Sequence, residues 1–267
     1  MKEEKVSPVV ITVIALMIVL GLAAFFKKEE VARVSWILLK NPELSMRIYP
    51  NAELAMQIGN HYFNTDGNGN YNLAKARAAF EKALSIDSMV PDAWHQLARI
   101  DFLESNFGGA LEKINTQIEL HGNSFMASYY MRGLIYAYRK EFGDAEKDFQ
   151  TYIASDKKNW AAHNDLAWVY FEEGKYAEAK KVAQNGLLFN ANNPWLWNMV
   201  GISLMNLGKL DAAHAALLKA LEEVRVLDEN DWHRAYPGNN PLLASQGLMK
   251  MRQSIEFNIG IIVGKRL

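Results

Sequence analysis

Residues 161–179 read AAHNDLAWVYFEEGKYAEA, and the spacing within this stretch decides the fold. A small residue, Ala167, is followed three places later by Tyr170 and twelve places later by Ala179. The small residue recurs along the chain at steps of 35, 34 and 34 residues, as Ala98, Gly133, Ala167 and Gly201. A fixed period near 34 residues is typical of stacked helix-turn-helix units. For such a chain the first question is which partner it binds.

Further columns appear when the units are aligned on the small residue. Alanine lies twelve places after it and an apolar residue four places beyond, as Ala110, Ala145, Ala179 and Ala213, then Ile114, Phe149, Ala183 and Leu217. An earlier unit aligns through Gly59 once a polar insertion, Thr65–Asn70, is allowed. In the unit of Ala98, Asp101 stands where a bulky residue is expected, and Phe102 is predicted to take that role.

Each unit is therefore predicted to form two amphipathic helices, with Gly174 and Gly208 at turns where a positive φ is useful. The columns resemble those of the tetratricopeptide repeat (TPR), most closely in AHNDLAWVY (162–170) and GKYAEA (174–179). The resemblance implies an all-α, right-handed TPR solenoid of about five helix-turn-helix repeats over residues 50–225.

The resemblance also implies that the first helix of each repeat lines a concave groove. By register, the groove residues are expected to be Phe63, His95, Arg99, Phe102, Tyr130, Leu134, Asn164, Trp168, Phe171, Asn198, Ile202 and Met205, with Ala137 one turn after Leu134. Trp168 and Phe171 are the strongest candidates, because neighbouring residues already supply the apolar core stripe of their helix. Such a groove suits an extended peptide or an amphipathic helix. The alternative is that each of these residues packs between helices as core.

The N-terminal region contains an apolar run. Residues 9–26 follow a short tail, 1–8, and form an uncharged stretch long enough to cross a bilayer as a single transmembrane helix. A cleaved signal peptide, removing residues 1–24, is the alternative. Lysines on both sides leave the orientation open. By analogy with bacterial anchored proteins, we expect a location at the inner membrane with the solenoid outside the cytoplasm.

Two further segments flank the repeats. Residues 27–49 are expected to form an amphipathic linker helix packed on the first repeat, or a segment at the membrane surface. Residues 226–267 are expected to form a loop and C-terminal helices that cap the stack. The apolar residues Phe257 and Ile261–Val263 suggest a second hypothesis, in which this tail docks on a partner or on a neighbouring copy.

The composition argues against several function classes. The chain has no cysteine and a net charge of −1, which excludes thiol chemistry and argues against nucleic acid as the main partner. Its six histidines lack metal-ligand spacing. The spacing of Asp66, Asn68 and Asn70 resembles an EF-hand loop but fails at Tyr71 and Arg77. We therefore expect no enzyme activity, cofactor or metal.

The sequence favours a membrane-tethered TPR scaffold or adaptor that binds a protein segment in its groove and supports assembly of a membrane-associated complex. One alternative is a chaperone-like factor for translocating or exported client proteins. A second alternative is an accessory subunit of an enzyme.

Overall fold

The computed structural model describes residues 17, 21, 27–63, 71–235 and 244–266. Within them the chain forms fourteen α-helices and one short 3-10 helix, and no β-strand. The predicted transmembrane segment 9–26 lies outside the described residues except for Met17 and Gly21, and so does the insertion 65–70 with Asp66, Asn68 and Asn70. Within the part of the chain that the structure describes, no helix has the length and apolar character needed to cross a bilayer.

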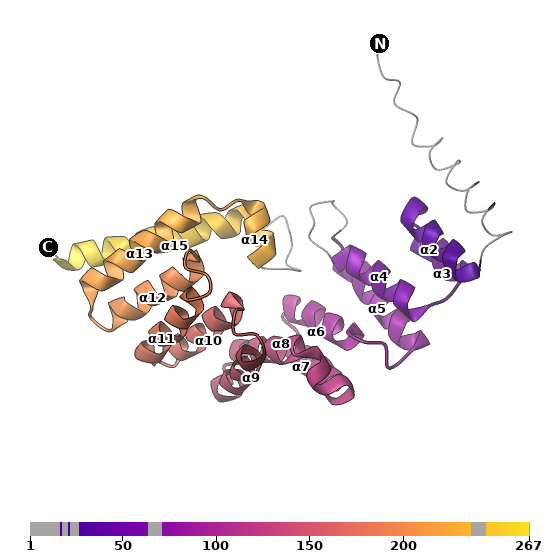
Figure 1. Ribbon diagram of the computed structural model, residues 1–267, viewed down its shortest axis with the longest axis horizontal. Helices are drawn as coiled ribbons and strands as arrows, with labels where there is room; N and C mark the ends of the chain where they lie inside the picture. The colour runs from indigo at the N-terminus through magenta and orange to yellow at the C-terminus, as the bar shows by residue number, and fades with distance from the viewer. Residues whose placement is uncertain (1–16, 18–20, 22–26, 64–70, 236–243, 267) are drawn as a thin grey trace, which may run out of the picture. The chain divides into compact units, whose positions relative to one another are not determined.

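The chain divides into two compact units, each described by itself. Unit 1 comprises residues 1–63 and 72–93, with helices α2 (Lys28–Leu39), α3 (Pro42–Ile48), α4 (Ala52–Phe63) and α5 (Leu73–Ile86) (Figure 1). The segment predicted as one linker helix, 27–49, is thus two helices. They separate at Lys40, which takes a left-handed conformation, and Asn41, whose side chain accepts a hydrogen bond from the Leu44 N–H and caps α3.

Unit 2 comprises residues 64–71 and 94–267. Its helices are α6 (Ala93–Leu103), α7 (Phe107–His121), the 3-10 helix η1 (Gly122–Phe125), α8 (Ala127–Tyr138), α9 (Phe142–Ser155), α10 (Trp160–Glu172), α11 (Tyr176–Leu187), α12 (Pro194–Asn206), α13 (Leu210–Arg225), α14 (Glu229–Ala235) and α15 (Ala244–Arg266) (Figure 1). With α4 and α5 of unit 1, the helices from α6 to α13 make five consecutive helix pairs along the sequence.

Local sequence explains where these helices begin and end. Asparagine side chains accept a hydrogen bond from the backbone N–H three residues later and so cap α5, α7, α10 and α12, at Asn72, Asn106, Asn159 and Asn193. At the turns between paired helices, Gly174 and Gly208 have φ of 75° and 72°, as predicted. Ser105 and Lys140 take the same left-handed conformation at the equivalent turns.

The small residues of the repeat bring paired helices close together. A Cβ atom at Gly133 would lie 3.0 Å from the Phe149 ring, and one at Gly201 would lie 2.6 Å from the Leu217 side chain. The alanines that recur twelve places after the small residue, Ala110, Ala145, Ala179 and Ala213, are all buried. Asp101 is also buried, and its carboxylate accepts a hydrogen bond of 2.6 Å from the Lys113 ammonium. Asp101, which stands at a repeat position where a bulky residue is expected, therefore forms an ion pair that joins α6 to α7.

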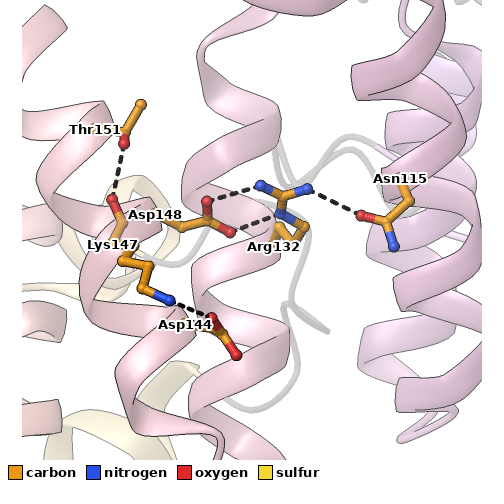
Figure 2. A network of polar contacts seen from close by, with 6 residues as sticks. All are labelled: Asn115, Arg132, Asp144, Lys147, Asp148 and Thr151. Carbon is orange, nitrogen blue, oxygen red and sulfur yellow. Dashed lines mark hydrogen bonds and ion pairs between the residues drawn. The ribbon is translucent and has the colours of Figure 1, made fainter.

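A second ion pair joins α8 to α9 (Figure 2). The Arg132 guanidinium donates to both carboxylate oxygens of Asp148, at 2.7 and 2.9 Å, and to the Asn115 side-chain oxygen of α7 at 3.0 Å. Hydrogen bonding to Asp148 raises the pKa of Arg132. The nearby pair of Lys147 and Asp144 lies on the surface of α9. Arg132 thus connects three successive helices through one planar group.

The last repeat of unit 2 is covered by α15. Leu248, Ile255 and Ile262 of this helix are buried, and the last two pack into the apolar cluster of α12 and α13. The Arg252 guanidinium donates to the backbone carbonyls of Val224 and Leu227, which satisfies acceptors at the end of α13. One face of α15 therefore covers the last helix pair, the position in which capping helices were expected.

Candidate partner-binding face

The first helices of three successive pairs in unit 2, α6, α8 and α10, carry a row of aromatic rings. Helix α10 contacts α8 on one side and α12 on the other. The Tyr138 ring of α8 lies 5.0 Å from the Phe102 ring of α6 and 5.6 Å from the Trp168 ring of α10, measured between centroids. Phe102 and Trp168 are half-buried, whereas Tyr138 is 55% exposed. The row is thus a continuous aromatic surface across three helices, with its most accessible ring in the middle.

Tyr138 was not among the expected groove residues. A step of three residues from Leu134 leads to Ala137, which is buried, and a step of four leads to Tyr138. Both steps stay on one face of a helix, so the periodicity alone does not choose between them. The size of the side chain is the signal that favours Tyr138.

A carboxylate lies beside this row. Asp165 of α10 accepts hydrogen bonds from the Tyr130 hydroxyl of α8 at 2.5 Å and from the Asn164 amide at 3.2 Å. Burial raises the pKa of Asp165 to about 6, and the two hydrogen bonds oppose that rise. The pKa of Tyr138 is also raised, by burial and by the negative charge of Asp165. No cationic side chain of the described residues pairs with Asp165.

Asp165 is a site residue that the sequence analysis missed, although its neighbour Asn164 was chosen. Its signal is an acidic residue directly before the apolar run Leu166–Phe171 on the first helix of a repeat. Only the neighbouring helix shows that the carboxylate is held by Tyr130 and not by solvent.

Residues 130–184, which hold most of α8, all of α9 and α10 and most of α11, match the family model for the tetratricopeptide repeat. This segment of the chain is therefore a tetratricopeptide repeat segment. No curated protein matches the chain by sequence. The repeat period, the paired helices and this match all indicate the same helix-turn-helix repeat.

Solved structures of TPR proteins share the fold of this chain. A crystal structure of MamA is 20% identical, with a TM-score of 0.54, and the alignment covers 65% of this chain and 92% of that one. YrrB, whose structure is described as a TPR protein with an unusual peptide-binding site, is 16% identical, with a TM-score of 0.54 and coverage of 68% and 91%. PilF of Pseudomonas aeruginosa is 18% identical, with a TM-score of 0.57 and coverage of 79% and 88%.

Two of the expected groove residues of the TPR array are buried. Phe63 lies in unit 1 and packs edge-to-face against Phe80. His95 is 8% exposed; its Nδ1 lies 3.1 Å from the Ser128 hydroxyl, and its backbone N–H donates to the Gln117 side-chain oxygen. Burial and the charge of Arg99 lower the pKa of His95 to about 3, so the imidazole is neutral at physiological pH. His95 thus joins α6, α7 and α8 by polar contacts.

The other expected residues are half-buried on the first helices of unit 2. Arg99 donates a hydrogen bond of 2.8 Å to Gln96. Leu134, Ile202, Met205 and Phe171 pack at the margins of the apolar clusters, and Phe171 also contacts the Tyr176 ring edge-on. The side-chain oxygen of Asn198 has no hydrogen-bond partner in the described part of the chain. The structure therefore brings Phe102, Tyr130, Asn164 and Trp168 together with Tyr138 and Asp165. We call these six residues the aromatic face.

Proposed function

We propose that this protein is a membrane-tethered TPR scaffold that binds a segment of a partner protein on the aromatic face and supports assembly of a membrane-associated complex. The observation that carries the proposal is the row of Phe102, Tyr138 and Trp168 with the Asp165 carboxylate beside it. Tyrosine and tryptophan are enriched at protein interfaces because they bury a large area while losing few rotamers. The structure of YrrB, a TPR protein with a peptide-binding site, supports the same use of the fold.

The chemistry of the face suggests what the bound segment contains. Asp165 is a partly desolvated carboxylate without a cationic partner among the described residues. A lysine or arginine placed there would neutralise the buried charge, and its cationic head would lie near the rings of Tyr138 and Trp168. We therefore propose that the partner segment carries a basic side chain between apolar residues.

The tether rests on the apolar run 9–26, which is long enough to span a bilayer. We propose a single-pass N-terminal anchor in a bacterial inner membrane, with the repeats on the extracytoplasmic side. Protease added to intact spheroplasts is expected to degrade the repeats of such a protein. Their survival until the membrane is lysed would reject this orientation.

The binding proposal is tested by crosslinked pull-down of the full-length protein from its native membranes, beside the variants Trp168→Ala/Phe171→Ala and Tyr138→Ala. We expect one dominant partner in fixed ratio, and its loss in both variants, because interface aromatics often contribute about 2 kcal/mol or more to binding. Tyr138→Ala is the cleaner variant, since this side chain is 55% exposed. Phe189→Ala is the matched control, because Phe189 is 48% exposed and lies outside the aromatic face.

The other outcomes contradict the proposal. Many weak partners in variable ratio would indicate a chaperone-like factor. A single partner that both variants retain would exclude the aromatic face as the interface. Co-purification with one enzyme whose activity changes on removal of this protein would indicate an accessory subunit.

Replacing Asp165 with asparagine is expected to weaken binding of a lysine-containing partner segment about tenfold at pH 7.5, because the attraction to the cation is lost. With the unchanged protein, binding is expected to weaken as the pH falls from 7.5 to 5, because Asp165 becomes protonated near pH 6. The variant should show no such dependence. Titration calorimetry at three pH values measures both effects.

The stability of the same variant distinguishes binding from a structural role. The pKa of Asp165 is raised from 3.8 when the protein folds, so the folded state binds more protons between pH 4 and pH 6 and its charged form is destabilising above pH 6. Asp165→Asn should therefore be at least as stable as the unchanged protein at pH 7.5, with an advantage that disappears below about pH 4. If the variant binds the partner segment normally but unfolds more easily at pH 7.5, the role of Asp165 is structural, as a contact between α8 and α10.

A further inference from the structure

Unit 1 contains a cavity of about 700 Å³ that the aromatic face does not include. It lies between the region where α2 passes into α3 and the pair α4 and α5. Its apolar part is formed by Ala55, Ile58 and Tyr62 of α4 together with Ala78 and Ala79 of α5. The small alanine side chains leave room for a close-packed neighbour.

The repeat itself indicates what would fill this space. Ala55, Ile58 and Tyr62 occupy the register positions that His163, Leu166 and Tyr170 occupy in α10, counted from Gly59 and Ala167. In α10, the second helix of the preceding repeat, α9, packs against two of these positions, Leu166 and Tyr170. There the Tyr170 hydroxyl donates a hydrogen bond of 2.7 Å to Glu146 and receives one of 3.3 Å from Gln150.

Helix α4 has no preceding repeat in the sequence. Helix α2 covers part of the same face, with Trp36 packed near Ile58 and its ring 6.4 Å from the Tyr62 ring. The cavity is the part of the face that α2 and α3 leave uncovered. A repeat unit buries its apolar face only against a neighbour, so this is where the second helix of a preceding repeat would lie.

The charged residues around the cavity indicate which charge a helix bound there should carry. Lys40, Lys75 and Lys82 line it, against one acidic residue, Glu43. None of the three lysines forms an ion pair with a described residue; Lys40 lies over the Trp36 ring and Lys75 over the Tyr62 ring, at 5.2 and 5.1 Å. An apolar floor with unpaired lysines at its rim suits an occupant whose apolar face is bordered by carboxylates.

The C-terminal helix of a second copy fits this rim poorly. Helix α15 carries Lys250, Arg252 and Lys265 and a single acidic residue, Glu256. Its basic side chains would meet the lysines of the cavity, which is unfavourable.

We propose that this cavity binds an amphipathic α-helix of a partner protein, with acidic residues along the borders of its apolar face, in the place of the missing preceding helix. It is a second protein-binding site, separate from the aromatic face and adjoining the segment that follows the apolar run 9–26. The protein would thereby hold one partner near its N-terminal end and another on the first helices of unit 2.

The test uses the full-length protein in neutral detergent micelles and a fluorescein-labelled helical peptide of about 18 residues, built from leucine, alanine and glutamate with glutamate bordering the apolar face. A counterpart peptide has lysine in place of each glutamate. Fluorescence anisotropy is expected to show saturable binding of the acidic peptide and about tenfold weaker binding of the basic one.

Two kinds of variant locate the site. Lys75→Glu/Lys82→Glu should weaken binding of the acidic peptide at least tenfold and strengthen binding of the basic peptide. Partial unfolding would not reverse the preference in this way. Ala78→Trp fills the cavity without changing its charge and should abolish binding of the acidic peptide; Ala78 is exposed, so the fold accommodates the ring. Lys158→Glu/Lys181→Glu, two exposed lysines of unit 2, is the matched control and should bind as the unchanged protein does.

Three results would overturn the proposal. Equal affinity of the acidic and the basic peptide would remove the role of charge. Loss of binding in the control variant as strong as in Lys75→Glu/Lys82→Glu would place the peptide elsewhere. Binding of phosphatidylglycerol added to the micelles, without any binding of the peptide, would identify the occupant as an anionic lipid. Retention of the acidic peptide by Tyr138→Ala would keep this site distinct from the aromatic face.

Discussion

Replacing Arg132 with methionine is expected to lower the free energy of unfolding by about 3 kcal/mol, because it leaves a buried carboxylate without its cation. The side chain of Asp148 is only 7% exposed, and both of its oxygens accept hydrogen bonds from Arg132. The Asn115 side chain also loses its donor, which loosens the link between α7 and α8. Urea denaturation followed by circular dichroism measures the change.

Two variants separate the buried pair from its surroundings. Arg132→Met/Asp148→Leu should recover most of the lost stability, because an apolar pair of similar size no longer leaves a buried charge. Lys147→Met should change stability by less than about 0.5 kcal/mol, because the side chains of Lys147 and Asp144 are 76% and 55% exposed. An equal cost for Arg132→Met and Lys147→Met would contradict this account of Figure 2.

Removing the buried side chains of the C-terminal helix has the largest expected effect. Ile255→Ala/Ile262→Ala should destabilise the protein by about 5 kcal/mol, since each truncation of a fully buried isoleucine costs about 2–5 kcal/mol. The two residues are two turns apart, so their costs should nearly add. Both side chains belong to the cluster that contains Leu217 and Val224 of α13, and the variant should expose this cluster to solvent.

A matched variant on the outer surface of the same helix distinguishes capping from docking. Phe257 is 70% exposed, so Phe257→Ala should change stability by less than about 0.5 kcal/mol. If the tail only caps the stack, this variant should also leave the assembly state unchanged in analytical ultracentrifugation. A change in assembly without a change in stability would instead support the hypothesis that the tail docks on a partner or a neighbouring copy.

The sequence predicted the repeated helix pairs well because their signals are local and periodic. The small residues Gly133 and Gly201 contact the bulky residues Phe149 and Leu217, and the repeat shows the same two columns in every unit except that of Ala167, where the bulky position holds Ala183. The positive φ at Gly174 and the caps of the helices are also properties of a few adjacent residues. The residues of one repeat therefore specify most of the structure of its helix pair.

The residues of the proposed aromatic face were predicted only in part. Register selected Phe102, Tyr130 and Trp168, but it did not distinguish the buried His95 from its half-buried counterparts, and it passed over Tyr138 and Asp165. Whether a residue at such a position is covered depends on the side chains of the next helix. Ser128 and Gln117 bury His95, whereas α10 leaves Tyr138 open.

The sequence by itself determined the all-α repeat, its five helix pairs, the turns between them and the apolar stripe of α15, because each depends on spacing within one helix or one pair. Only the tertiary structure decided that the buried carboxylates of Asp101 and Asp148 are held by cations of a neighbouring helix, that Asp165 has a raised pKa, and that α4 retains an unfilled apolar cavity bordered by lysines. These features arise where side chains from different helices meet. The free energy of a charged side chain there depends on how deeply it is buried and on which partners it has, and the residue type alone gives neither.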